Sequence, residues 1–291
     1  MPSLKEIKGR INSVRSTLKI TSAMKMVASA KLHRAQGAIA NMLPYERKLH
    51  NVLVHLMAEG VSVSGGASGS AALMEQREVR RVAIIAFASN SSLCGAFNSN
   101  AVRAVKAVIS EYRNSGLKPS DITVYSVGRK MADAMKRLGY ASPEDFSKLS
   151  DKPSYAPAAE LAQKIMDLYL DGTYDRVELV YNHFASTSSQ PSVQETYLPL
   201  SLPGGEGGCD YIVEPSREVL LERLMPLSTR LKVYTVLLDS SAAEHAARTV
   251  AMQIATDNGN ELLSDLTLEY NKGRQQKITS EILDIVGGSL Q

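Results

Sequence analysis

The sequence predicts an α/β protein in which an antiparallel coiled coil of long N- and C-terminal helices accompanies a central Rossmann-like domain with a mainly parallel sheet. Residues 3–55 and 216–287 each have the pattern of one long helix. Between them, apolar β-branched runs alternate with helical stretches, as in doubly wound α/β domains. Two long helices at opposite ends of a chain are expected to pair as a rod, which favours a mechanical or scaffolding part over a self-contained enzyme.

The N-terminal helix, within a domain predicted at 1–58, carries a heptad repeat. Its positions advance alternately by three and four residues, and only Thr21 and Lys25 break the apolar pattern. Such a seam is typical of a left-handed coiled coil. Met24 and Met26 flank the break, and flexible thioethers suit a surface that meets changing neighbours. The seam positions are Leu4, Ile7, Ile11, Val14, Leu18, Thr21, Lys25, Ala28, Leu32, Ala35, Ile39 and Met42.

Basic residues gather in this helix. Residues 1–50 contain ten Lys or Arg against two acidic residues, a net charge of +8, whereas residues 216–291 contain eight against ten, a net charge of −2. The basic helix indicates an acidic partner, which could be a protein surface, a nucleic acid or phospholipid. The alternative is an ordinary solvated helix face.

The bulk properties are those of a soluble protein of one or two domains. The chain has 291 residues, of which 44% are hydrophobic, and its first residues lack the apolar core of a secretory signal. No stretch approaches the roughly 18 apolar residues of a membrane span. Cys94 and Cys209 have no partner motif, so we expect free thiols in a reducing cytosol.

The central region is predicted as a flexible Gly/Ser linker at 59–76 followed by an α/β domain at 77–210. Buried strands are expected at 79–89, 122–128 and 177–183, helices at 95–115, 129–138 and 155–170, and an alternating edge strand at 192–200.

The C-terminal region, residues 211–291, is predicted as the second coiled-coil helix. Pro215 lies near its first turn, where proline is tolerated. Pro226 is expected to kink or interrupt the helix. The glycine pair at 287–288 is a plausible end of the helix.

A search for catalytic motifs yields weak candidates. Neither GxxxxGK[ST] nor GxGxxG follows the first strand. The polar turn at 89–98 and the turn at Gly128 occupy the strand ends where α/β proteins bind ligands, but both also suit ordinary connections. Cys94 could be a nucleophile at a helix start, although a buried inert thiol is the more frequent case. The five histidines show no metal-ligand spacing.

Several ordered strings resemble the gamma subunit of bacterial F-type ATP synthases. They are ITSAMKMVA at 20–28, LCGAFN at 93–98, AM and ATDNG within 251–259, YNK with RQ at 270–275, and ITSEILDIVGG at 278–288. The resemblance spans the chain, strongly over 1–50 and 240–288. It departs at Gly288, where alanine is usual, and at residues 90–92.

The resemblance implies the central rotor shaft of the ATP synthase. The partners would be three alpha and three beta subunits, the epsilon subunit, the c-ring and possibly a regulatory inhibitor. The chain would bind no cofactor or nucleic acid, because ATP, ADP and Mg belong to sites in the alpha and beta subunits. It would lie peripherally at the cytoplasmic face of the inner membrane. Turning the asymmetric shaft would couple proton flow to ATP synthesis or hydrolysis.

The resemblance also implies roles for individual residues. Met24, Lys25, Arg274, Gln275, Thr279 and Glu281 would contact the catalytic ring. The apolar residues Ile282, Ile285 and Val286 would turn in an apolar bearing, and Tyr211 and Glu214 would belong to the foot on the c-ring and epsilon subunit. The simpler alternative for each is a coiled-coil surface residue that affects stability only.

Two other functions stay open at this point. A basic coiled-coil protein that binds nucleic acid or acts as a scaffold would explain the charge of residues 1–50, but the chain has few aromatic residues for stacking on bases. A small α/β enzyme with helical arms would bind a ligand at the Cys94 or Gly128 turn.

Overall fold

The computed structural model describes residues 3–58, 69–201 and 213–288. The chain divides into two compact units, a smaller unit of residues 1–29 with 248–291 and a larger unit of residues 30–247. Each unit contains part of both long helices, α1 (Leu4–Ala58) and α6 (Arg217–Gly288). The predicted domain limits, at residues 58, 76 and 210, stay predictions.

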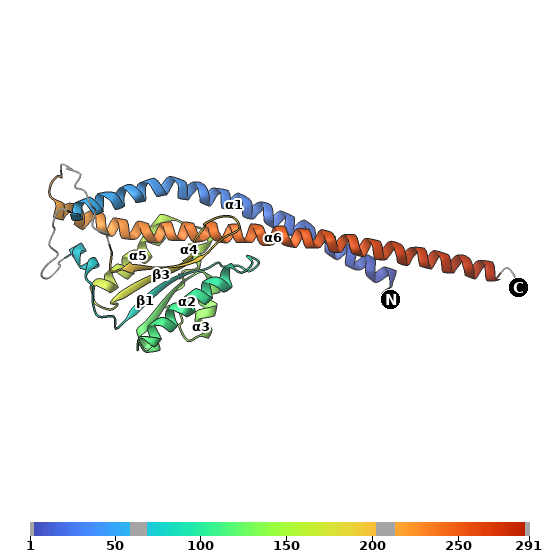
Figure 1. Cartoon of the computed structure of the whole chain (residues 1–291), viewed down its shortest axis with the longest axis horizontal. Coiled ribbons are helices and arrows are strands. Elements are labelled where there is room, and N and C mark those ends of the chain that lie inside the picture. Colours follow the sequence, from blue (N-terminus) through green and yellow to red (C-terminus); the bar gives the residue numbers. More distant parts are fainter. Residues whose placement is uncertain (1–2, 59–68, 202–212, 289–291) are drawn as a thin grey trace. The chain divides into compact units, whose positions relative to one another are not determined.

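The larger unit is built on a four-stranded sheet with the strand order β2-β1-β3-β4. β1 (Val82–Phe87) pairs in parallel with β2 (Ile122–Val127) and with β3 (Arg176–Asn182). β4 (Ser192–Leu198) pairs antiparallel with β3 at one edge. Figure 1 shows these strands beneath the paired helices of the same unit. The mainly parallel sheet and the edge strand are confirmed.

The central strand β1 is apolar along its whole length because both of its faces are covered. All six of its residues are buried. A strand buried on both faces has a continuous apolar sequence, whereas the exposed edge strand β4 alternates. This difference in burial explains why β1 (VAIIAF) is apolar throughout, whereas β4 (SVQETYL) alternates between polar and apolar residues.

Helices cover both faces of the sheet. α2 (Phe97–Asn114) and α3 (Arg129–Arg137) pack on one face, where Val105 and Met131 are buried against Ile84. α5 (Tyr155–Leu170), the short α4 (Ser147–Asp151) and the segment 233–237 of α6 pack on the other. A 3-10 turn, η2 (Pro119–Asp121), leads into β2.

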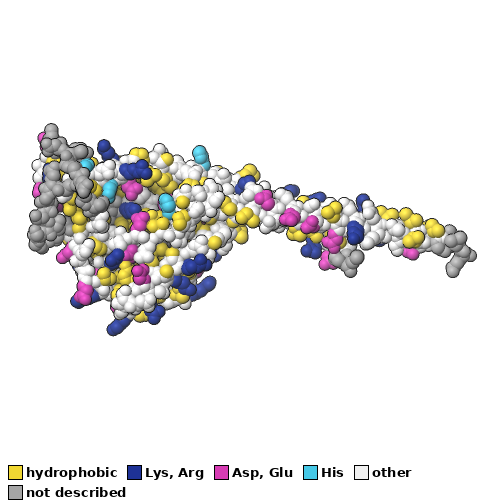
Figure 2. Space-filling model, in the orientation of Figure 1, with side chains coloured by type: hydrophobic (Ala, Val, Ile, Leu, Met, Phe, Trp, Pro, Cys, Tyr) yellow, Lys and Arg dark blue, Asp and Glu magenta, His cyan; other side chains and the backbone are white. Residues whose placement is uncertain are grey.

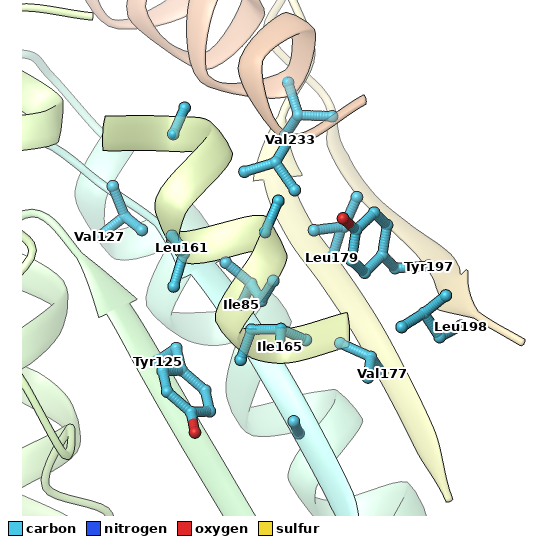
Figure 3. Packing of buried hydrophobic residues seen from close by; sticks show 14 of the residues in the cluster. Ile85, Tyr125, Val127, Leu161, Ile165, Val177, Leu179, Tyr197, Leu198 and Val233 are labelled. Atoms are coloured by element: carbon cyan, nitrogen blue, oxygen red, sulfur yellow. The ribbon is translucent and has the colours of Figure 1, made fainter. Parts of the chain in front are cut away.

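The core between the sheet and α5 is filled by large apolar side chains from three elements. Leu161 and Ile165 of α5 lie among Ile85 and Leu179 of the sheet and Val233 of α6 (Figure 3). Each of these five side chains is at most 2% exposed. This layer therefore fixes the segment 233–237 of α6 to the sheet.

The part of the predicted linker that is described is folded. Residues Gly69–Met74 form a 3-10 helix, η1, and Leu73 is only 1% exposed within the main core. The Leu73 carbonyl also accepts a hydrogen bond of 2.8 Å from the Leu200 amide. The expectation of a flexible linker is thus wrong for 69–74, because a Gly/Ser-rich context masked one apolar anchor. Residues 59–68 lie outside the described residues.

Pro226 does not interrupt α6, which runs without a break from Arg217. The neighbouring Leu221 and Met225 are buried against Leu53 and Leu56 of α1. A proline within a helix costs a hydrogen bond and adds a clash, but this packing holds the helix before Pro226, and the buried Val233 holds it after. The expected interruption at Pro226 is therefore wrong, and the alternative of a kink stays a prediction.

Candidate coupling and partner-contact surfaces

The smaller unit is an antiparallel helix pair. Leu4 lies against Gly273 and Leu18 lies against Gly259, so a step of 14 residues along α1 matches a step of 14 back along α6. Ile7 and Ile11 are buried with Leu266 in the same seam. All twelve predicted heptad positions are buried or half-buried, including those of the larger unit. The antiparallel coiled coil is confirmed.

At the polar break in the heptad, a hydrogen bond joins the two helices. The Thr256 hydroxyl donates a hydrogen bond of 3.0 Å to the Thr21 hydroxyl across the pair, and it also lies 2.8 Å from the Met252 carbonyl. Both threonines are half-buried. A polar pair within an apolar seam favours one register because a shift would bury unpaired hydroxyls.

Met24 and Lys25 are both half-buried on α1, next to this polar break. The neighbouring side chains are much more open, since Ile20, Met26 and Val27 are 59%, 68% and 58% exposed. Ile20 and Val27, one heptad apart, share one face of α1, and Met26 lies on another. The structure thus places Met24 and Lys25 at the seam, next to exposed apolar side chains.

The predicted contact residues near the end of α6 are exposed. They are Arg274, Gln275, Thr279 and Glu281. The Thr279 hydroxyl donates a hydrogen bond of 2.9 Å to the Gln275 carbonyl, and Lys277 lies 3.5 Å from Glu281. Both interactions are local to the helix, and exposed ion pairs of this kind contribute little to stability.

The last described turns of α6 are apolar and exposed. Ile282, Ile285 and Val286 are 54%, 71% and 52% exposed, and Leu283 between them is 65% exposed. Exposed apolar side chains gathered on one broad face of a helix are typical of a surface that another molecule covers. Contacts of this kind are non-directional, because they involve no hydrogen bonds.

The predicted foot is described only in part. Glu214 is exposed in the segment before α6. Two residues later, the Ser216 hydroxyl accepts a hydrogen bond of 3.4 Å from the Val219 amide in the first turn of α6. Tyr211 and Cys209 lie outside the described residues.

In the turn after β1, a candidate ligand site, the polar groups form hydrogen bonds with one another. The Asn98 side-chain oxygen accepts hydrogen bonds from the amide and the hydroxyl of Ser89, each of 3.0 Å. The Asn98 amide donates to the Ser91 carbonyl at 3.2 Å and to the Cys94 sulfur at 3.1 Å. Cys94 is 1% exposed, which agrees with a buried thiol. These groups are therefore already paired within the turn.

The second candidate turn is closed by the protein backbone. The first amides of α3 bind within the chain, because Arg129 N donates to the Asn90 side-chain oxygen at 2.8 Å and Lys130 N donates to the Ser89 carbonyl at 3.1 Å. Next to both turns remains a cavity of only about 10 Å³, bordered by Leu237 and Glu244 of α6. The strand ends that hold ligands in other α/β proteins are thus filled here.

A polar network that no sequence motif reveals joins the end of β3 and β4 to α6. Glu195 of β4 lies 2.7 Å from the Lys232 ammonium and accepts a hydrogen bond of 2.7 Å from the Tyr181 hydroxyl. His183 lies 2.6 Å from Asp239. These residues are far apart in the sequence, so no motif could reveal them.

The network shifts the pKa of two of its members. Burial raises the pKa of Tyr181 well above its usual value, and the hydrogen bond to Glu195 adds to this. Burial alone would raise the pKa of Glu195, but hydrogen bonds from Lys232 and Tyr181 hold that pKa below its usual value. The network borders a cavity of about 360 Å³ that Ile39 of α1 also lines.

The described residues contain neither a candidate membrane span nor a candidate metal cluster. None of their helices has the length and apolar content of a membrane span. Their histidine, cysteine and carboxylate side chains form no group of three or more that could hold a metal ion.

Known proteins resemble the chain along its whole length. A family model described as ATP synthase matches residues 3–290. The ATP synthase gamma chain of Bacteroides thetaiotaomicron is 52% identical over all of both chains, and that of Phocaeicola vulgatus is 53% identical, again over all of both chains.

Solved structures share the fold. A chain in the OSCP, F1 and c-ring assembly of the Euglena gracilis mitochondrial ATP synthase superposes with a TM-score of 0.67 at 21% identity, over 99% of this chain and 93% of that chain. A chain of the rotor of the same enzyme gives 0.59 at 19% identity, over 94% and 98%. With the coiled coil, the parallel sheet and the full-length relatives established, the chain belongs to the gamma-chain family of ATP synthases.

Proposed function

We propose that this chain is the central rotor shaft of an F-type ATP synthase and couples proton flow through the membrane sector to ATP synthesis or hydrolysis. The observation that carries the proposal is the end of α6, where Ile282, Ile285 and Val286 stand exposed although they are apolar. A helix end of this kind needs a surrounding partner, and an apolar sleeve would let it turn because no directional bonds must break.

Coupling follows from symmetry. Three identical catalytic interfaces around one asymmetric shaft meet different faces of it, so each adopts a different conformation and nucleotide affinity. A shaft can bias these conformations only through contacts that differ in free energy between them. Rotation moves these contacts from one interface to the next.

The proposed partners are three alpha and three beta subunits, the epsilon subunit and the c-ring, with a regulatory inhibitor as a further candidate. The chain binds no cofactor in this proposal, and ATP or ADP with Mg occupies the alpha and beta subunits. The filled turns after β1 and β2 support this division, because they leave no ordinary α/β ligand site open. The complex would place the chain at the cytoplasmic face of the inner membrane.

Met24 and Lys25 are proposed to face the beta subunits on one side of the shaft, with Arg274, Gln275, Thr279 and Glu281 as further ring contacts. Their exposure or half-burial supports these roles, since their side chains are available to a partner. Glu214 and Tyr211 are proposed for the foot on the c-ring and epsilon subunit.

The test is Met24→Lys in the assembled enzyme. A second ammonium beside Lys25 adds like-charge repulsion at a half-buried position, so ATP-driven proton pumping into inverted membrane vesicles should fall severalfold while ATP hydrolysis continues. Met24→Leu keeps the volume and the apolar character and should pump normally. Met26→Lys adds the same charge at a side chain that is 68% exposed, and it should have the smaller effect.

Normal pumping by Met24→Lys at normal hydrolysis rates would refute the assigned contact. The partner composition has its own test, which is native mass spectrometry of the complex purified through a tag on this chain. One copy with three alpha and three beta subunits is expected, and a lone chain or a homodimer would overturn the rotor proposal.

A further inference from the structure

The outer surface of α2 and α3 is basic. Residues 97–140 contain eight Lys or Arg against three acidic residues, a net charge of +5. The larger unit as a whole, residues 30–247, contains 23 of each and is neutral, so its residues outside 97–140 have a net charge of −5. Figure 2 shows dark-blue side chains gathered where Figure 1 places these helices. The basic layer consists of Arg103, Lys106, Arg113, Lys118, Arg129, Lys130, Lys136 and Arg137.

Seven of the eight basic side chains belong to α2 and α3, and Lys118 lies in the connection just before η2. In α3, Met131 and Met135 point into the core, and Lys136 and Arg137 are exposed. In α2, Arg103, Lys106 and Arg113 recur at a spacing of three and seven residues, which keeps them on one helical stripe. Both stripes therefore lie on the surface of the same layer.

Fold stability explains only part of this pattern. Arg113, Lys136 and Arg137 lie in the last turns of their helices, where cations are favoured by the helix dipole. Arg129 and Lys130 lie in the first turn of α3, which has no acidic residue and where the dipole disfavours cations. None of the eight basic side chains forms an ion pair with another described residue.

We propose that the basic layer is a docking surface for the anionic headgroups of a phospholipid bilayer. A stable protein partner would need an apolar or aromatic anchor at the centre of its contact. Within residues 97–140, the only large apolar side chain that is strongly exposed among the described residues is Leu138, at 41%. A bilayer needs only the charges, because each basic residue near an anionic leaflet strengthens binding about fivefold.

This inference goes beyond the rotor proposal, and its test needs only the purified full-length chain. Binding is measured by co-sedimentation with phosphatidylcholine vesicles that contain or lack phosphatidylglycerol. The layer variant changes Arg103, Lys106, Lys136 and Arg137 to Gln. The control variant changes Lys31, Arg34, Arg47 and Lys48 to Gln, which removes the same charge from α1 in the same unit. Circular dichroism establishes that both variants are folded.

We expect the chain to prefer vesicles with phosphatidylglycerol and to lose this preference as salt rises. The layer variant, which lacks four of these residues, should bind about 600-fold more weakly, and the control variant within about threefold of the unchanged chain. An equal loss of vesicle binding in both variants would mean that only the net charge of the chain matters, and it would overturn the proposal. Equal binding to both kinds of vesicle, or displacement by an acidic polypeptide far below the lipid concentration, would also overturn it.

Discussion

Gly128 lies where the fold leaves no room for a side chain. It follows β2 with a φ of +105°, and a Cβ at this position would lie 2.1 Å from the carbonyl oxygen and 2.8 Å from the carbonyl carbon of Ala88. Those atoms belong to the backbone, so no rotamer change can relieve the contact. The Ala88 carbonyl also accepts a hydrogen bond of 3.0 Å from the Ser150 hydroxyl, which holds it in place.

The expected cost of Gly128→Ala has two parts. The positive φ costs about 1–2 kcal/mol for a residue with a side chain. Forcing the backbone at Ala88 aside adds about 1–3 kcal/mol, as for other overpacked sites, and weakens the hydrogen bonds of the Ala88 and Ser89 carbonyls. We expect a total of about 2–5 kcal/mol, a large part of the 5–15 kcal/mol that stabilises a typical domain.

Gly116→Ala is the matched control. Gly116 has a similar φ of +98°, but no atom lies within 4 Å of its added Cβ. Gly116→Ala should therefore lower the free energy of unfolding only by the cost of the positive φ, about 1–2 kcal/mol.

Urea unfolding of the full chain measures both variants. The chain lacks tryptophan, and eleven of its twelve tyrosines lie in residues 30–247, so tyrosine fluorescence reports on the larger unit. A Gly128→Ala loss within about 0.5 kcal/mol of the Gly116→Ala loss would refute the reasoning from backbone contact.

Three further outcomes are expected. Lys232→Met should raise the pKa of Glu195 in the folded chain, because a hydrogen bond that lowers this pKa is lost. A carboxyl group whose pKa is lowered by folding stabilises the folded chain above its unfolded pKa, and this stabilisation disappears as the pH falls. The midpoint of acid unfolding, below about pH 4.5, should therefore move to higher pH in the variant. A circular dichroism titration would show this, and an unchanged midpoint would contradict it. Thr21→Val and Thr256→Val should each cost about 0.5–1.5 kcal/mol, and the double variant less than their sum, in thermal unfolding. Leu161→Ala should cost about 2–5 kcal/mol in urea, since the side chain is 2% exposed.

The sequence predicted the long-range plan of the fold because its signals are periodic. The heptad of α1 and the apolar run of β1 each encode a face to be buried, and both were assigned correctly. Leu73 was missed because one apolar residue in a Gly/Ser-rich stretch forms no period. The helix through Pro226 was missed because tertiary packing outweighed a local preference.

The candidate site divides in the same way. Lys25 could be placed on the seam from the heptad alone and Met24 next to it, and the structure leaves both half-buried. The network around Glu195 could not be predicted, because Tyr181 and Lys232 meet it only after the sheet and α6 have packed. No local sequence pattern indicates which elements pack together.

The antiparallel pairing of the smaller unit has a consequence for biosynthesis. Thr21 and its partner Thr256 are separated by 235 residues, and a ribosome adds about 5–20 residues per second. The first helix therefore leaves the ribosome tens of seconds before its partner is made. During that interval Ile7 and Ile11, which are buried in the finished protein, have no neighbour from this chain. The nascent helix must be shielded by other molecules, or it will pair with another copy of itself, until the last codons are translated.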